Sequence, residues 1–171
     1  MPDQPDIPVH LDGRSRQGGL VVPWITATVS GVHVFGTIDA HAQQACLHGR
    51  RCQVCGQRLP ARAVLFARPA DLRQACTVEP ATCPPCANYS THACPMLAGR
   101  RDRYRPTGHP ALAGLPPSDD AHLRRAAPAE PWFAVWVRGY DVRPHPDRSG
   151  LLAASWARIP PLTIRRLPAT T

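Results

Sequence analysis

The apolar positions of this chain fall in short runs that proline, glycine and charged residues separate. From Leu20 to Phe35 most residues are β-branched or aromatic, and Ser30 and Gly31 interrupt them, which predicts two short strands or a strand and its return. The longest apolar stretch begins at Leu20 and is too short and too interrupted to span a bilayer. We therefore expect no membrane association.

A short helix is predicted next, from an N-cap at Asp39 to a stop at about Gly49. Its expected apolar stripe is Ala42, Ala45 and Cys46. This helix would lead the chain directly to Cys52.

Two further strands are expected over residues 61–67 and near 75–78, and they would form an irregular hairpin. Pro84 and Pro85 suit the first turn of a helix, where a missing amide proton costs nothing. That helix would run towards Met96, with Pro95 constraining its end.

The last third begins with a segment rich in proline and ends in strand-like sequence. Residues 106–131 hold six prolines and predict a linker or a long surface loop. Residues 131–142 (PWFAVWVRGYDV) are apolar on both faces, which predicts a buried strand. Residues 145–150 form a turn signal, after which 151–159 can pair back as a hairpin.

These elements predict an α+β protein with four parts. Residues 1–19, polar and rich in proline and glycine, are expected to be a disordered arm. Residues 20–105 would form the principal domain, 106–130 the linker or surface loop, and 131–171 a C-terminal β segment packed on that domain.

Four cysteines carry the clearest chemical signal. CQVCG at 52–56 and CPPC at 83–86 are two C-x-x-C pairs with 27 residues between them. Two thiolate pairs at this spacing can complete one tetrahedral zinc site with no open position for water, so the ion would be structural. A knuckle, a hairpin and a helix carrying Cys52, Cys55, Cys83 and Cys86 would make a treble-clef-like core; the alternative is reduced, buried cysteines without a metal.

The other three cysteines lack such a spacing. Cys94 either replaces a ligand or packs beneath the site, and packing is the favoured interpretation because free cysteine is commonly buried. A second zinc site built from Cys46, Cys76, Cys94 and a histidine such as His92 stays an alternative.

Charge is concentrated near the proposed site. The formal net charge is +8, and all twenty basic residues are arginines. Residues 50–105 hold ten arginines against three acidic residues, whereas residues 1–49 hold two against four. Arginine grips phosphate bidentately and stacks on bases, so nucleic acid is a candidate partner; the alternative is a solvated surface in a proteome biased towards arginine. The candidate contacts are Arg50, Arg51, Arg100, Arg101, Arg103 and Arg105.

An enzymatic alternative is a divergent nuclease of the HNH type, some of which carry two C-x-x-C pairs. Such enzymes need a histidine base and further groups that hold a catalytic divalent ion. His92 and Asn88 suit the second role, but residues 56–82 contain no histidine to act as the base. A redox role is weaker, because no βαβ pattern surrounds either pair.

Three segments together resemble a known family: VPWITA at 22–27, RRCQVCG at 50–56 and TCPPCANYSTHACPML at 82–97. The chain is similar over residues 21–100 to small actinobacterial (Streptomyces-type) zinc-binding proteins, often labelled cell envelope biogenesis proteins. It departs at Met96, where that family tends to have histidine, and at Ala40 and His41, where the family has a basic helix containing glutamine. The resemblance implies zinc and an actinobacterial or phage origin, but no activity.

We expect a non-catalytic, zinc-stabilised interaction protein whose partner is nucleic acid or another protein. No small-molecule substrate is evident from the sequence. The first ten residues lack the basic and apolar regions of a secretory signal, and paired C-x-x-C motifs are typical of reducing compartments, so a cytoplasmic location is expected.

Overall fold

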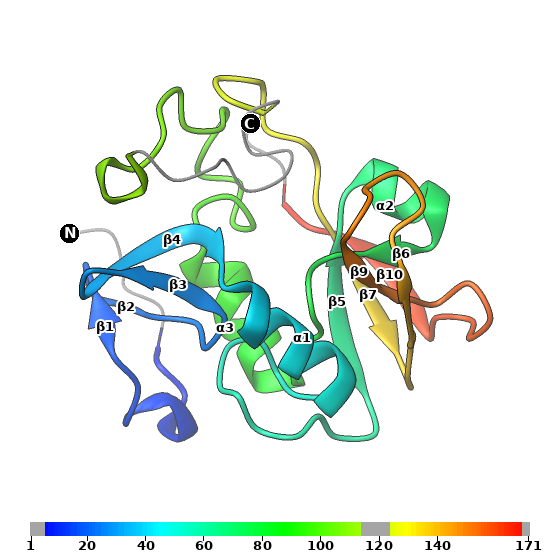
Figure 1. Cartoon of the computed structure of the whole chain (residues 1–171). Helices are drawn as coiled ribbons and strands as arrows, with labels where there is room; N and C mark the ends of the chain where they lie inside the picture. Colours follow the sequence, from blue (N-terminus) through cyan, green and yellow to red (C-terminus); the bar gives the residue numbers. More distant parts are fainter. Residues whose placement is uncertain (1–5, 114–123, 169–171) are drawn as a thin grey trace.

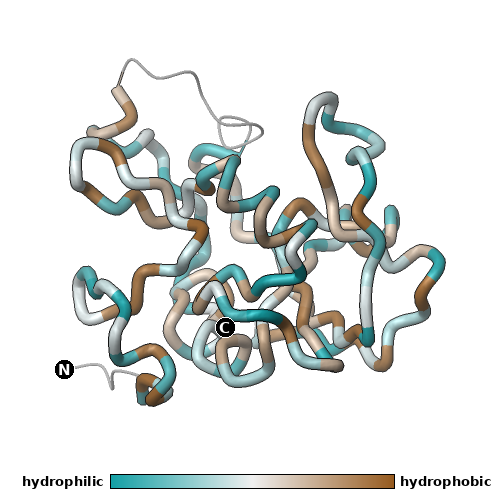
Figure 2. Tube along the Cα trace, turned by 60° about the horizontal axis from the view of Figure 1, so that its bottom comes forward, coloured by the Kyte–Doolittle hydropathy of each residue, from teal (hydrophilic) through white to brown (hydrophobic). Residues whose placement is uncertain are grey.

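The computed structural model describes residues 6–113 and 124–168. Its secondary structure is mixed: three α-helices and ten short strands in four small sheets lie within these residues. Figure 1 shows the hairpins of the N-terminal part on one side, the C-terminal strands on the other, and helices α1 and α3 between them. In Figure 2 the hydrophobic and hydrophilic parts of the chain alternate at short intervals, as expected for short elements.

The N-terminal part begins with a 3-10 helix, η1 (Val9–Leu11), followed by the two-residue strands β1 (Arg16–Gln17) and β2 (Leu20–Val21). The side chain of Leu11 is completely buried, and Val21 is nearly so. Residues 6–19 therefore differ from the disordered arm that the sequence predicts, because Leu11 packs into the interior of the protein. The remaining arm residues, 1–5, lie outside the described residues.

The predicted strand and return are present as the hairpin of β3 (Thr26–Val29) and β4 (Val32–Ile38). Its two turn residues, Ser30 and Gly31, have φ values of +49° and +79°. This backbone conformation matches the twist of two-residue hairpins, and glycine adopts it without a steric cost.

Helix α1 (Ala40–Gly49) begins as predicted, since the Asp39 carboxylate accepts a hydrogen bond from the backbone N–H of Ala42. Its buried face consists of Gln43, Cys46 and Leu47, so the predicted stripe is wrong for Ala45, which is exposed. The Gln43 amide donates to the carbonyl oxygen of Val78, which satisfies a polar group on this buried face.

The hairpin predicted between the two cysteine pairs is wrong. Strand β5 (Ala63–Ala67) does form and is entirely buried, but helix α2 (Pro69–Gln74) separates it from the short β6 (Cys76–Thr77). Strand β5 pairs with β7 (Phe133–Val137), and β6 pairs with β9 (Leu152–Ser155). Long-range pairing with the C-terminal strands replaces the local hairpin because β5 and β7 are both apolar on two faces.

The C-terminal part is a set of antiparallel strands. The predicted return hairpin is present as β8 (Asp141–Pro144) and β9, and β10 (Thr163–Arg166) forms the edge of the sheet β10-β7-β5. A 3-10 helix, η2 (Pro110–Leu112), occupies part of the predicted linker, whose residues 114–123 lie outside the described ones.

Three groups of buried side chains hold these elements together. The first lies between helix α1, strand β9 and one face of the paired strands β5 and β7. The second lies between the opposite face of these two strands and helix α3 (Pro84–Ala93). The third joins the N-terminal segment to the chain around Cys52 and Cys55 and to α3, and it includes Leu11, Val21, Val54, Tyr89 and Ala93. Because its members come from three distant parts of the sequence, this third group positions the candidate site.

Candidate metal centre

The first cysteine pair lies in a tight backbone turn at residues 52–57, the cysteine turn. The N–H of Gly56 donates to the carbonyl oxygen of Cys52, and the N–H of Cys52 donates to the carbonyl oxygen of Gln57, each at 2.8 Å. Gly56 has a φ of +76°, and a Cβ atom there would lie 2.9 Å from the nearest atom of the Trp24 ring. Glycine is thus required twice, by the backbone conformation and by the close approach of an aromatic ring.

The second pair lies at the start of α3. Cys83 is the N-cap residue, Pro84 occupies the first helical position, and Cys86 follows in the first turn and is completely buried. Sulfur atoms here face the positive end of the helix dipole, which favours the thiolate form. The sequence predicted this placement correctly.

His10 is the residue that the sequence did not predict. It lies in η1, and its Nε2 atom is 3.2 Å from the Sγ atom of Cys86. Two contacts hold this segment in place: Leu11 packs into the third buried group, and the backbone N–H of Val21 donates to the hydroxyl of Tyr89 on α3 at 2.9 Å. No fixed spacing links a histidine at position 10 to the cysteine motifs, so sequence reasoning had no signal for it.

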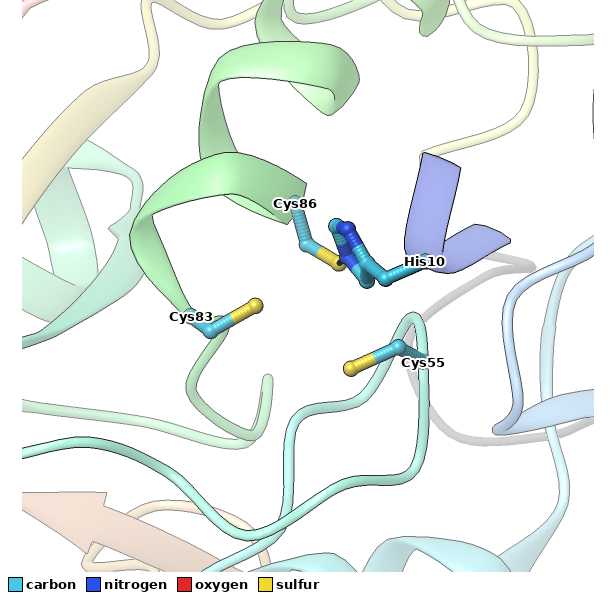
Figure 3. Close-up of side chains that lie close together, drawn as sticks. All are labelled: His10, Cys55, Cys83 and Cys86. Carbon is cyan, nitrogen blue, oxygen red and sulfur yellow. Dashed lines mark hydrogen bonds between the residues drawn. The ribbon is translucent and has the colours of Figure 1, made fainter. Parts of the chain in front are cut away.

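Four side chains converge at this point, as Figure 3 shows. One ligand atom from each of His10, Cys55, Cys83 and Cys86 lies within 4.8 Å of the other three. Zinc–sulfur bonds of about 2.3 Å place tetrahedral sulfur atoms roughly 3.8 Å apart, so the group needs only small movements to close around one ion. The cluster could hold a metal ion, and thiolate with imidazole is a donor set typical of zinc.

Cys52, the remaining predicted ligand, is not one of these four side chains, but it interacts with two of them. The pKa of Cys83 is lowered to about 4, first because the Cys52 thiol donates a hydrogen bond to its sulfur and then because Cys86 does so. The pKa of Cys86 is raised, chiefly through its hydrogen bonds with Cys52 and Cys83. Burial raises the pKa of Cys55, and the backbone N–H of Gln57 opposes that change. The four mutually close donors thus include His10 and not Cys52, which lies beside them and interacts with Cys83 and Cys86.

The other cysteines serve packing. Burial raises the pKa of Cys46 to about 12, which keeps it a neutral thiol on the core face of α1. Cys76 is completely buried in β6, and Cys94 packs against the group between α3 and the sheet. Within the described residues, His10 and its three cysteines are the sole group of three or more metal-ligating side chains, so no second zinc site forms there.

The six arginines predicted to contact nucleic acid do not form one cluster of free side chains. Arg50 stacks on the Tyr140 ring at 4.0 Å, and Arg51 donates to the carbonyl oxygen of Gly56. Arg100 donates to the carbonyl oxygens of His92 and Ala93, at the end of α3. Arg103 donates to Ala126, and Arg101 and Arg105 are exposed. A guanidinium has five N–H donors, so these contacts leave capacity for phosphate.

The residues considered for a nuclease give that alternative little support. The His92 ring lies 2.8 Å from the carbonyl oxygen of Asn88 through Nδ1, one helical turn away. Among the described residues no acidic side chain joins them in a metal-binding group.

Comparison of the chain with protein-family models, with curated proteins and with solved structures found no match. The actinobacterial resemblance therefore stays a prediction. In the described part of the chain, no helix has the length and apolar character needed to cross a bilayer.

Proposed function

We propose that this protein is a non-catalytic, zinc-stabilised interaction protein. The observation that carries the proposal is the convergence of donor atoms from η1, the cysteine turn and the start of α3 on one point. These segments are distant in sequence. A bound ion would link the cysteine turn to α3, and the contact of His10 with Cys86 would join η1 to them. Structural zinc of this kind contributes on the order of 10 kcal/mol of apparent folding free energy.

The proposed ligands are Cys52, Cys55, Cys83 and Cys86, with His10 as a hydrogen-bond donor to the Cys86 sulfur. His10 belongs to the group of mutually close donor atoms and Cys52 does not. Two observations support Cys52 as a ligand: it interacts with the sulfur atoms of Cys83 and Cys86, and the turn at Cys52–Gly56 has the hydrogen bonds of a zinc knuckle. Four thiolates would leave no position for water, which is why the proposed role is structural. The treble-clef-like arrangement stays a proposal, supported by the turn and the helix.

The experiment is metal analysis of the full chain purified without added zinc, followed by thermal unfolding with and without a chelator. We expect one zinc ion per chain and a large drop in the unfolding temperature when the ion is removed. The matched control is Cys94→Ser, which changes a cysteine outside the cluster and should keep the zinc. A metal-free protein whose unfolding is unaffected by the chelator would contradict the proposal.

For the partner, we propose nucleic acid, and a protein is the other outcome of the test. The support is the exposed arginine-rich segment at residues 100–105, next to the end of α3. Replacing Arg101 and Arg105 by alanine should flatten the salt dependence of DNA or RNA retention by about one unit of slope for each phosphate that these side chains neutralise. The control is the pair Arg62→Ala and Arg138→Ala, two exposed arginines elsewhere on the surface.

If DNA and RNA are not retained, or are retained equally at all salt concentrations, the nucleic-acid proposal is wrong and a protein is the partner to test.

The nuclease alternative is tested on the same sample by incubating plasmid DNA with the protein and a divalent ion. Cleavage that disappears in His92→Ala would show that the protein is a nuclease and contradict the non-catalytic role. The cytoplasm is the proposed location, because the ligands must stay reduced to bind zinc.

A further inference from the structure

A cleft of about 340 Å³ lies on the face of the sheet β10-β7-β5 that helix α3 covers only in part. Its floor is apolar and consists of Val64 and Phe66 from β5 with Ala134 and Trp136 from β7. The first three of these are core residues at most 7% exposed, so the floor is part of the packed core. The volume is at the lower end of the range for small-molecule pockets, roughly 300–1,000 Å³.

The two sides of the cleft differ in chemistry. On one side are Ala87, Asn88 and Thr91 of α3, which supply small and neutral polar groups. On the other side is the exposed Arg165 of the edge strand β10, which pairs with Ala134 and therefore shares its face of the sheet. The next residue, Arg166, pairs with Phe133 and directs its side chain to the opposite face. The Arg165 guanidinium makes no hydrogen bond or ion pair with any residue in the part of the chain that the structure describes, so one guanidinium without a protein partner borders an apolar floor.

This combination selects one class of ligand. A guanidinium binds a carboxylate with two parallel hydrogen bonds, and the geometry rewards a planar anion. The apolar floor favours binding of a hydrocarbon group. It disfavours a sugar–phosphate backbone, whose polar atoms would lose their hydrogen bonds to water without gaining hydrogen bonds to the protein. We propose that the cleft binds a small carboxylate that carries one apolar acyl or aryl group, with the carboxylate on Arg165 and the apolar group over Trp136.

This inference goes beyond the proposed function, because α3 uses opposite faces for the two sites. Cys86, Tyr89 and Ala93 face the N-terminal segment and the cysteine turn, whereas Ala87 and Thr91 face the cleft. A ligand in the cleft would touch the helix that the proposed zinc ion anchors without touching the zinc ligands.

The experiment is isothermal titration of the full, metal-loaded chain with decanoate, and with decylammonium as the probe of opposite charge and equal length. We expect saturable one-to-one binding of decanoate, with a change in the fluorescence of the half-buried Trp136, and no binding of decylammonium. Arg165→Ala should weaken decanoate binding by about tenfold or more, the effect expected when a charge-assisted hydrogen bond is removed. Arg166→Ala removes the neighbouring charge on the opposite face and should change the affinity by less than about twofold.

Two further variants make the test specific. Thr91→Phe adds a ring at a partly exposed position on the cleft wall and should also weaken decanoate binding by about tenfold, because the ring occupies the apolar floor. Arg62→Ala removes one exposed arginine outside the cleft and should change the affinity by less than about twofold. Equal binding of the two probes, no saturable binding of decanoate, or unchanged affinity in Arg165→Ala would each overturn the proposal. Zinc content measured on the same sample reports separately on the proposed function.

Discussion

The Nε2 atom of His10 lies 3.2 Å from the Sγ atom of Cys86, although 76 residues separate them in the chain. This contact joins the N-terminal 3-10 helix to the first turn of α3 at the cysteine cluster. It places an imidazole where it can act either as the donor of a hydrogen bond to a thiolate or as a metal ligand in place of Cys52. The two roles predict different spectra.

Cobalt substitution should distinguish them. If the four cysteines bind the ion, Cys52→Ser should lower the thiolate-to-cobalt charge-transfer absorption by about a quarter, because one of four thiolates is removed. His10→Gln should leave that absorption unchanged and weaken metal affinity by about tenfold or more, as is usual for partners of a ligand. A changed spectrum in His10→Gln together with an unchanged one in Cys52→Ser would make His10 the ligand.

Leu11 should anchor the N-terminal segment that carries His10. Leu11→Ala is expected to lower the free energy of unfolding by about 2–5 kcal/mol, because a completely buried side chain leaves a cavity. Val9→Ala is the matched control, since Val9 lies in the same 3-10 helix but is 86% exposed, and its effect should be close to zero. Urea denaturation measures both. Equal stability of the two variants would mean that the segment is not anchored as described.

Gly56 should not tolerate a side chain. Gly56→Ala is expected to destabilise the protein by about 1–3 kcal/mol or more, because the backbone has a φ of +76° and the new Cβ atom would meet the Trp24 ring. Gly31→Ala has a similar φ of +79° but open space around the Cβ position, so it should show the backbone cost alone. The difference between the two variants in a denaturation experiment measures the steric clash, and the zinc content of Gly56→Ala shows whether the cysteine turn still binds.

His145 should make stability depend on pH. Burial, and then the charge of Arg148, lower its pKa below the ordinary value of 6.5, while Asp71 and Asp147 oppose this shift. Its Nδ1 atom accepts a hydrogen bond from the backbone N–H of Asp147, which protonation would break. The unfolded chain therefore binds the proton more readily, and stability should fall as the pH drops below about 6.5 towards the pKa of the folded state.

The measurement compares the unfolding free energy of wild type and His145→Gln at about pH 7.5 and at about pH 5.5, on either side of the histidine range. The variant should lose less stability on acidification than wild type, and the cysteine cluster contributes equally to both. Identical decreases would show that His145 is not the group that titrates.

The sequence by itself determined several local elements and the placement of the two cysteine pairs. Asp39 starts a helix because its carboxylate accepts from a backbone N–H three residues on, and Pro84 starts another because that position needs no amide donor. Gly56 and the C-x-x-C spacing likewise act over a few residues. Local rules of this kind placed the hairpin of β3 and β4 and the start of α3 correctly.

Tertiary structure decided what lies beside what. Strand β5 pairs with β7 rather than with its neighbour β6, and His10 reaches Cys86, because burial of apolar side chains such as Leu11 rewards contact without regard to separation along the chain. The cleft beside Arg165 arises in the same way, where α3 covers one part of a sheet and leaves the rest open. Sequence motifs report local geometry, whereas these contacts depend on how the faces of distant elements pack together.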